Sequence, residues 1–330
     1  MRNYLFLLIF FIASPALAIG NIVDTAFVID AVKRGAIIWD VRNAAEYHKG
    51  HIPGAINIGA VAQALRNPNT EDFLPIAQIE KTLGAAGLDP AQEIIVYATR
   101  GDPNAYLGLY AVNVHGGKRG HVYHDGIDGW RTAGQEISTA AHQRAAVALK
   151  LTLNTGAMVN TPEMLAAAKR SGAQIIDTRT VAEFTGNDIR AIRGGHIPGA
   201  VNIPYEQNWI DPDTPTKLAR KQVADNTGMS LKAVDELKKL YATLDPEKET
   251  IVYCQSGTRA AETAVVLSKL GFKNVKVYEP SWLGYAAVLS APANNETFFN
   301  VGALNGRLST MLQRIEQLER ELAAEKARRP

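Results

Sequence analysis

Short apolar runs, rich in β-branched residues, alternate with helix-like stretches along most of the chain. Residues 175–176, 251–253 and 275–277 are such runs. A helix is predicted between them from Thr161, as its N-cap with Pro162 at the first position, to Arg170. This alternation of strands and helices predicts an α/β fold in which parallel sheets are flanked by helices on both faces.

The same pattern occurs twice. Residues 33–42 recur as 169–179, residues 50–58 as 195–203, and residues 95–98 as 251–254. The period is far longer than that of a solenoid repeat, so we predict a duplicated domain. The expected boundaries are 19–140 for the first domain, 141–154 for an Ala-rich linker and 155–297 for the second domain.

The N-terminal end lies outside the duplicated pattern. Residues 1–18 combine a basic Arg2, an apolar run and a small-x-small site at 16–18, which is typical of a cleaved signal peptide. The run is too short to span a bilayer, and no later stretch of sequence is apolar enough to do so. We therefore expect a periplasmic protein, exported and without a membrane span after cleavage.

The C-terminal end, residues 300–328, is expected to form one helix. Its apolar residues are spaced alternately by four and three positions: Leu304, Leu308, Met311, Ile315, Leu318 and Leu322. This is the a/d pattern of a coiled coil, so we predict a coiled-coil-like helix that forms a homo-oligomer through residues 303–325. The alternative is that the helix folds back onto its own domain.

Composition and charge narrow the classes of partner. The formal net charge is +2, and no basic run occurs outside the C-terminal tail, so we expect no nucleic-acid partner. His115, His121 and His124 lie in a Gly-rich turn without carboxylates at ligand spacing. We therefore predict that these histidines are surface residues and that the chain holds no metal.

The single cysteine, Cys254, marks the candidate active site. It ends an apolar run, and a helix-like segment starts six residues later at Ala260. A strand–loop–helix connection of this kind directs backbone N–H groups toward an anion. These groups and Arg259 should stabilise a thiolate, while Gly257 permits the tight turn. A buried core cysteine is the ordinary alternative, but the end of a strand favours a nucleophile. With no second thiol in the chain, any group on Cys254 must leave to an outside molecule.

Three motifs together resemble a known family. Residues 177–179 (Asp-Thr-Arg), 195–200 (Gly-His-Ile-Pro-Gly-Ala) and 254–259 (Cys-Gln-Ser-Gly-Thr-Arg) resemble the rhodanese (thiosulfate sulfurtransferase) family in its tandem-domain form, and the resemblance covers residues 20–295. It implies two rhodanese-like domains and a sulfurtransferase that carries sulfur as a persulfide on Cys254. A small donor such as thiosulfate would supply the sulfur, a thiol or cyanide would accept it, and no cofactor is implied.

The resemblance also assigns roles within the site. The substrate would be bound by the loop residues Gln255, Ser256, Gly257, Thr258 and Arg259. Arg259 would pair with the donor's sulfonate or brace the loop on Asp177. Asp177, Arg179 and His196 would give structural support, since the Asp ties strand to loop and the His-Ile-Pro-Gly turn fixes the backbone.

The sequence departs from the family at several positions. Ala98 stands where the second repeat has Cys254, so the first domain should be catalytically silent. Gln255 replaces a frequent basic residue, and Glu183 replaces an arginine of many tandem members, which weakens the case for thiosulfate as the preferred donor. The second repeat also has an insertion before Gly195, with Arg190 and Arg193. Either those two residues restore positive charge near the site, or the insertion is an ordinary surface loop. Arg193 is included among the predicted substrate-binding residues.

Two other functions remain open at this point. A cysteine phosphatase also holds a thiolate in an anion-binding loop, but its Cys and Arg are separated by five residues, and here Gln255 to Thr258 make four. A non-enzymatic sulfur-carrying or partner-binding role is favoured by the cysteine-free first domain and by the C-terminal helix.

Overall fold

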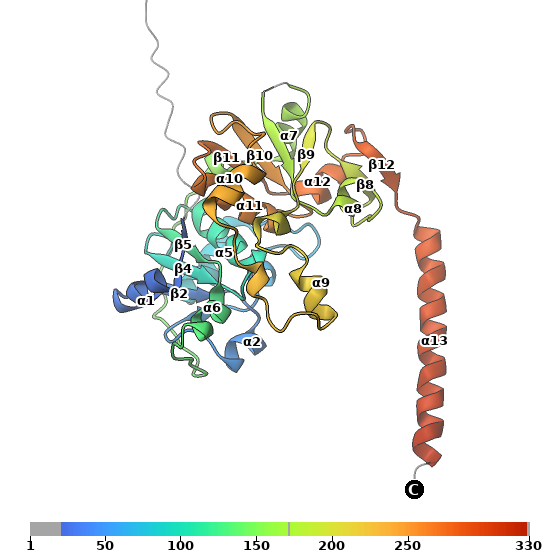
Figure 1. The fold of residues 1–330 in the computed structure, drawn as a ribbon, viewed down its shortest axis with the longest axis horizontal. Coiled ribbons are helices and arrows are strands. Elements are labelled where there is room, and N and C mark those ends of the chain that lie inside the picture. The colour runs from blue at the N-terminus through green and yellow to red at the C-terminus, as the bar shows by residue number, and fades with distance from the viewer. Residues whose placement is uncertain (1–20, 171, 329–330) are drawn as a thin grey trace, which may run out of the picture.

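In a computed structural model, the chain forms two α/β domains followed by a long C-terminal helix (Figure 1). The structure describes residues 21–170 and 172–328, and the predicted signal peptide, 1–18, lies outside them. Among the described residues, no helix is long and apolar enough to cross a membrane.

The first domain is built on a five-stranded parallel sheet with the strand order β1-β5-β4-β2-β3. Its strands are β1 (Asn21–Val23), β2 (Ile37–Asp40), β3 (Ile56–Asn57), β4 (Ile94–Tyr97) and β5 (Gly120–Tyr123). Its helices are α1 (Thr25–Lys33), α2 (Ala44–Lys49), α3 (Val61–Leu65), α4 (Ile76–Ala85), α5 (Pro103–Val114) and α6 (Gly126–Thr132). Every residue of β2 and β4 is buried, in keeping with their apolar sequences, which only Asp40 at the end of β2 interrupts.

The second domain repeats this topology with the order β6-β11-β10-β7-β9. Its strands are β6 (Met158–Val159), β7 (Gln174–Asp177), β9 (Ala200–Asn202), β10 (Glu249–Tyr253) and β11 (Asn274–Tyr278). Its helices are α7 (Thr161–Ala167), α8 (Val181–Phe184), α9 (Thr214–Ala219), α10 (Val234–Leu240), α11 (Thr258–Lys269) and α12 (Ser281–Ala287). Short 3-10 turns occur at Thr155–Ala157, Tyr205–Asn208 and Thr227–Met229. The predicted α/β fold with parallel sheets is confirmed in both halves.

The predicted start of α7 is wrong by one residue. Asn160, not Thr161, is the N-cap, and its side chain accepts the backbone N–H of Glu163 at 2.9 Å. The Glu163 carboxylate returns a bond to the Asn160 N–H at 2.9 Å. This reciprocal capping box satisfies two helix-terminal donors and shifts Thr161 and Pro162 into the first turn.

The two domains pack through equivalent helices. Helix α5 of the first domain lies against α11 of the second, and both follow the central strand of their sheets. Every residue of α5 from Ala105 to Val114 is buried. One continuous apolar core therefore crosses the domain boundary and includes Cys254 at its edge.

The segment predicted as a linker runs along the first domain. It has no regular secondary structure, but the Val147 N–H donates to the Gly84 carbonyl at 2.9 Å and the Leu151 N–H to Glu80 Oε1 at 2.8 Å. A Cβ at Gly84 would lie 2.6 Å from the Val147 carbonyl oxygen, so this close approach requires glycine. The segment is an ordered strap rather than a loose connection.

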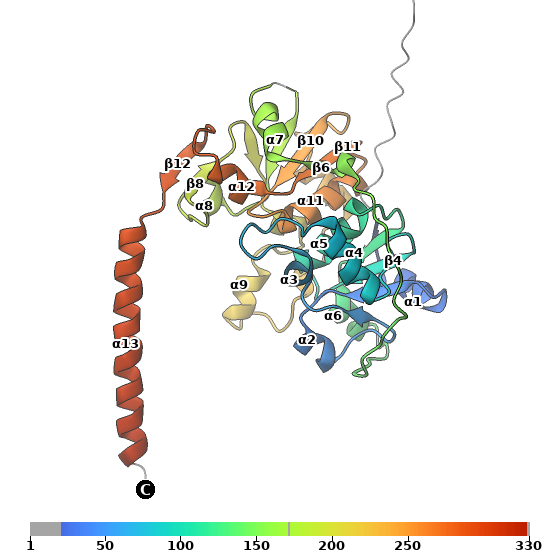
Figure 2. The same cartoon turned by 180° about the vertical axis from the view of Figure 1, so that it is seen from behind.

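The C-terminal helix α13 (Val301–Arg328) extends away from both domains (Figures 1 and 2). Just before it, β12 (Asn294–Phe298) pairs antiparallel with β8 (Arg193–His196), which follows the inserted segment. The predicted apolar stripe is exposed, from 37% at Leu304 to 61% at Met311. The helix does not fold back onto its own domain.

Candidate active site

The loop after β10 holds the sulfur of Cys254 against a backbone donor. We call residues 254–259 the active loop. The Gly257 N–H donates to Cys254 Sγ at 3.1 Å, and the α11 N-terminus begins at the next residue. The first N–H groups of α11 have no intrahelical acceptors, as at every helix N-terminus, and favour negative charge beside them. Cys254 is 1% exposed, so burial alone would fit a core cysteine; the loop around it distinguishes the site.

The start of α12 fixes the active loop from the other side. The Cys254 N–H donates to Ser281 Oγ at 3.1 Å, and the Cys254 carbonyl accepts the Trp282 N–H at 3.0 Å. The Leu283 N–H reaches the Gln255 carbonyl at 2.9 Å. Ser281 has φ +51°, a left-handed conformation that costs a non-glycine residue energy. The Ser281 hydroxyl thus binds the backbone of Cys254 from a strained conformation.

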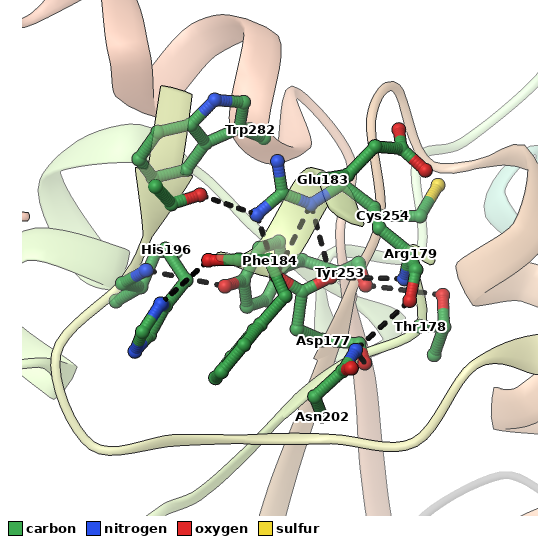
Figure 3. A network of polar contacts seen from close by, with 12 residues as sticks. Asp177, Thr178, Arg179, Glu183, Phe184, His196, Asn202, Tyr253, Cys254 and Trp282 are labelled. Carbon is green, nitrogen blue, oxygen red and sulfur yellow. Dashed lines mark hydrogen bonds and ion pairs between the residues drawn. The ribbon is translucent and has the colours of Figure 1, made fainter. Parts of the chain in front are cut away.

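Asp177 and Arg179 form a fully buried pair next to the site (Figure 3). Arg179 Nη2 lies 2.6 Å from Asp177 Oδ2 and also donates to the Gly195 carbonyl at 2.7 Å. The guanidinium carbon stands 4.7 Å from the centre of the Trp282 ring. The pair joins the end of β7 to β8 and to α12, so these side chains support the loop rather than face a substrate.

His196 stacks on Phe184 with ring centroids 3.6 Å apart, and its Nδ1 contacts the Phe184 carbonyl at 2.9 Å (Figure 3). Burial lowers the pKa of His196 below 6.5, against the opposing effect of that carbonyl. A neutral ring whose Nδ1–H is donated to a backbone carbonyl is a structural fixture of the turn.

Arg259 braces the active loop on Glu183, not on Asp177. Its Nη1 and Nη2 lie 2.7 and 2.8 Å from the two carboxylate oxygens of Glu183, because Asp177 is already occupied by Arg179. Burial alone would raise the pKa of Glu183, but the Arg259 bonds outweigh it and lower the pKa to about 2. Burial likewise opposes the raised pKa of Arg259, for which Glu183, Cys254 and Glu206 are responsible. Both Nη atoms of Arg259 are therefore bound to Glu183, which balances most of the guanidinium charge.

The two arginines of the insertion take different places. Arg190, half-exposed, lies 3.3 Å from Glu183 Oε1, and its carbonyl accepts Gln255 Nε2 at 2.7 Å, so it is linked to the active loop. Arg193 is 1% exposed and donates to backbone carbonyls of α12 and the following turn, and to Glu296. The prediction that Arg193 binds substrate is therefore wrong: its donors hold the C-terminal strand on the domain.

Besides the residues at the start of α12, sequence reasoning missed Arg66 and Glu279 beside the active loop. Arg66, from the first domain, donates to the Ser256 carbonyl at 2.5 Å and contacts Thr258 Oγ1 at 3.4 Å. Glu279 receives Arg66 Nη2 at 3.2 Å. Burial, only partly opposed by Arg66, raises the pKa of Glu279 to about 7. Both residues lie outside the repeated motifs, and no local pattern relates Arg66 to a loop 190 positions later.

The histidine prediction was wrong about location. His115 and His124 are buried, at 2% and 5% exposure, and His121 is partly buried. His124 Nδ1 contacts the Tyr106 hydroxyl at 2.8 Å, and its Nε2 contacts the Met229 carbonyl at 2.8 Å. Within residues 21–170 and 172–328, no group of three or more His, Cys, Asp or Glu side chains is placed to hold a metal ion.

Two segments of the chain, residues 25–133 and 161–287, match the family described as the rhodanese-like domain. The thiosulfate sulfurtransferase of Corynebacterium glutamicum is 31% identical over 260 residues, which cover 74% of this chain and 80% of that protein. The thiosulfate sulfurtransferase of Azotobacter vinelandii is 29% identical over 247 residues, 74% of this chain and 86% of that one. Among solved structures, the anaerobic ergothioneine biosynthesis enzyme from Chlorobium limicola superposes with a TM-score of 0.71 at 18% identity, over 83% of this chain and 70% of that chain, a likeness of fold.

Proposed function

The chain belongs to the rhodanese family and is a sulfurtransferase, and we propose that it moves sulfane sulfur from a small donor, such as thiosulfate, to cyanide or a thiol through a persulfide on Cys254. The observation that carries this proposal is the Gly257 N–H placed 3.1 Å from Cys254 Sγ at the N-terminus of α11. A backbone donor in that position stabilises an anionic sulfur without rearrangement.

The proposed reaction has two steps, and each leaves a negative charge in the active loop. The Cys254 thiolate attacks the outer sulfur of thiosulfate; a sulfur–sulfur bond forms to the enzyme, and the bond to the sulfonate sulfur breaks as sulfite leaves with its electron pair. Cyanide then attacks the terminal sulfur of the persulfide, which releases thiocyanate and restores the thiolate. No general base is required once the thiol is ionised.

Glu183 bears on which donor is preferred. A divalent anion such as thiosulfate gains most from an unpaired arginine, whereas Arg259 is held by both oxygens of Glu183. We propose that a donor with less charge beside its sulfane sulfur, such as glutathione persulfide, competes well with thiosulfate. The test is a donor panel of thiosulfate, mercaptopyruvate and glutathione persulfide, with persulfidation of Cys254 read by mass spectrometry. A Glu183→Gln variant should favour thiosulfate more than wild type does, and an unchanged donor ranking would contradict the role of Glu183.

A second candidate function is a sulfur carrier that docks on a partner, and the exposed helix α13 is the observation that favours it. The two functions separate by turnover: an enzyme releases many equivalents of thiocyanate per Cys254, and a carrier releases one. An assay with an aryl phosphate distinguishes both from a phosphatase.

We propose export to the periplasm, supported by the basic start, the short apolar run and the small-x-small site in residues 1–18. Mass spectrometry of the protein recovered from cells should find a mature N-terminus after Ala18. Cytoplasmic protein that retains residues 1–18 would contradict this.

We propose that α13 associates with the same helix of a second copy. Its exposed a/d positions follow a strict four-three spacing, and the helix extends away from its own domains instead of packing against them (Figure 2). Light scattering should show an oligomer for wild type and for Gln313→Glu, which lies on the opposite helix face. Ile315→Glu should give a monomer, because it places a charge in the apolar seam. A monomeric wild type at micromolar concentration would contradict the proposal.

A further inference from the structure

A buried arginine of the cysteine-free domain reaches the back of the active loop. Arg66 follows α3 and is 3% exposed. Its Nη1 donates to the Ser256 carbonyl at 2.5 Å, and its Nη2 lies 3.2 Å from Glu279 Oε1. A buried arginine bound to both a carbonyl and a carboxylate has little freedom to move, because losing either hydrogen bond would leave a charged N–H donor unsatisfied.

The carbonyl that Arg66 holds belongs to a critical peptide unit. Ser256 C=O and Gly257 N–H are the two ends of one planar trans peptide, so they point in opposite directions. When Arg66 binds the oxygen on one side, the N–H is directed to the other side, where Cys254 Sγ lies 3.1 Å away. If this peptide turned over, its carbonyl oxygen would face the sulfur and would repel a thiolate.

This peptide is also the one in the loop most able to turn over. Rotation of a peptide plane changes ψ of the residue before it and φ of the residue after it. Gly257 has φ +88° and, without a Cβ, tolerates either sign of φ. A Cβ at this position would lie 3.0 Å from both Arg66 Nη2 and the Glu279 carbonyl oxygen, tighter than an ordinary contact, so any larger residue would press on both. Gly257 thus leaves room for Arg66 beside the loop, and its flexibility is the reason why the peptide needs to be held. We call the contact of Arg66 with the Ser256 carbonyl the clamp.

Glu279 connects the first domain to the start of α12, the second segment that contacts Cys254. It accepts the Phe73 N–H at 3.2 Å as well as Arg66, so the first-domain segment 66–73 grips it from two points. Two residues later, Ser281 Oγ accepts the Cys254 N–H. Segment 66–73 therefore touches both stretches of chain that fix the nucleophile.

We propose that Arg66 is a positioning residue for sulfur transfer: by holding the Ser256 carbonyl, it keeps the Gly257 N–H directed at Cys254 Sγ. The first domain thus contributes to the reaction without a thiol of its own. This inference rests on the proposed function for its effect on turnover, but the effect on the thiol can be measured separately.

The test compares full-length Arg66→Met with wild type by the pH dependence of Cys254 alkylation with iodoacetamide. Loss of the directed N–H should move the midpoint of that profile up by roughly one pH unit. Below the midpoint, this lowers the thiolate fraction, and with it thiosulfate–cyanide turnover, about tenfold. Turnover should recover toward wild type as the pH rises, which a general loss of packing would not produce.

Arg100→Met is the matched control. Arg100 is 7% exposed and crosses the same interface in the opposite direction, from the first domain to Asn226 and Thr227 of the second. Among the described residues it makes no bond to the active loop. It should lower the melting temperature as Arg66→Met does, but leave the alkylation profile unchanged.

Superimposable profiles for Arg66→Met, Arg100→Met and wild type would overturn the proposal. If Arg66→Met fails to fold, Arg66→Lys decides, since one ammonium cannot bind both the carbonyl and Glu279 in the arginine geometry. Its profile should move in the same direction, and an unmoved profile overturns the inference. If wild type transfers no sulfur from any donor, the proposed function fails, while the alkylation profiles still decide the role of Arg66.

Discussion

The active loop and the matching loop of the first domain, residues 98–103, share two backbone features but have different surroundings. We call the latter the cysteine-free loop. It turns at Gly101 with φ +73°, as the active loop turns at Gly257 with φ +88°. The Ala98 carbonyl accepts a helix-start N–H at 3.0 Å, as the Cys254 carbonyl does. The two loops therefore share this turn and this carbonyl contact, although only one of them carries a thiol.

The difference lies in what covers each loop. A Cβ at Gly101 would lie 2.8 Å from Met229 Cε, and Arg100 donates to Asn226, so the second domain is packed directly onto the cysteine-free loop. The active loop receives Arg66 behind the Ser256 carbonyl instead. The cysteine-free loop thus serves as a contact between the domains. The first domain, which contains it, in turn supports the active loop of the second domain through Arg66.

A second difference lies one turn away. Gly126 and Ser281 both have φ +51° at the start of equivalent helices. In the first domain a Cβ at Gly126 would lie 2.1 Å from the Ala98 carbonyl oxygen, so glycine is required. The second domain keeps a side chain there, and its hydroxyl binds the Cys254 N–H. The strain is retained only in the half that has a thiol to position.

The largest expected effect comes from moving the thiol. In Ala98→Cys/Cys254→Ala, the new cysteine would sit in a loop packed under Met229, without a serine hydroxyl for its backbone N–H. Sulfur transfer should remain at background. Thiocyanate formation above that of Cys254→Ala alone would show that the cysteine-free loop is still a working site and that the comparison is mistaken.

Gly257→Ala should lower turnover roughly 10–100-fold, because the strain of positive φ and the contacts with Arg66 and Glu279 distort the loop. Gly101→Ala is the control in the other domain. Both variants should lose about 1–3 kcal/mol of stability in urea unfolding. Only Gly257→Ala should lose activity, and equal losses would mean that the two loops matter only through stability.

Ser281→Ala should lower turnover about tenfold, because the buried Cys254 N–H is left without an acceptor at a cost of about 1–3 kcal/mol. Ser268→Ala, which removes an ordinary bond to the Ala264 carbonyl on α11, serves as the control and should leave turnover unchanged. Wild-type kinetics for Ser281→Ala would show that its strained conformation has no part in the reaction.

The smallest effect on turnover is expected at Glu279, where the prediction concerns the pH dependence of stability. Glu279, which faces Arg66 and Asp72, has its pKa raised by burial to about 7, from 4.5. As the pH rises from about 4.5 through 7, the unfolded chain releases this proton before the folded one does, so wild type loses stability relative to Glu279→Gln. The difference should be on the order of 2–3 kcal/mol between pH 4.5 and 8 in urea unfolding. If the difference in stability between wild type and Glu279→Gln stays constant across this range, the pKa of Glu279 is not raised by folding, and the prediction is wrong.

Local patterns in the sequence were enough to predict the α/β fold, the duplication and the strand–loop–helix around Cys254. Each depends on residues close in the chain: apolar runs, turn glycines and helix starts. The partners of the loop could not be read in this way. Arg259 was expected to pair with the donor's sulfonate or to brace the loop on Asp177; Arg179 occupies Asp177, and Arg259 pairs with Glu183 instead. Arg193 is a positive residue in the inserted segment, as a substrate-binding residue would be, yet it is buried and paired with Glu296 of β12. Arg66 belongs to another domain altogether. These contacts are decided by packing between distant segments, for which a single sequence has no signal.

The most direct test of the central claim is the mass of the chain after incubation with thiosulfate and then with cyanide. Wild type should gain the mass of one sulfur atom on the peptide that contains Cys254, and cyanide should remove it with release of one equivalent of thiocyanate. Cys254→Ser should fold like wild type and gain nothing. Sulfur found on another residue, or thiocyanate formed by Cys254→Ser, would contradict the account.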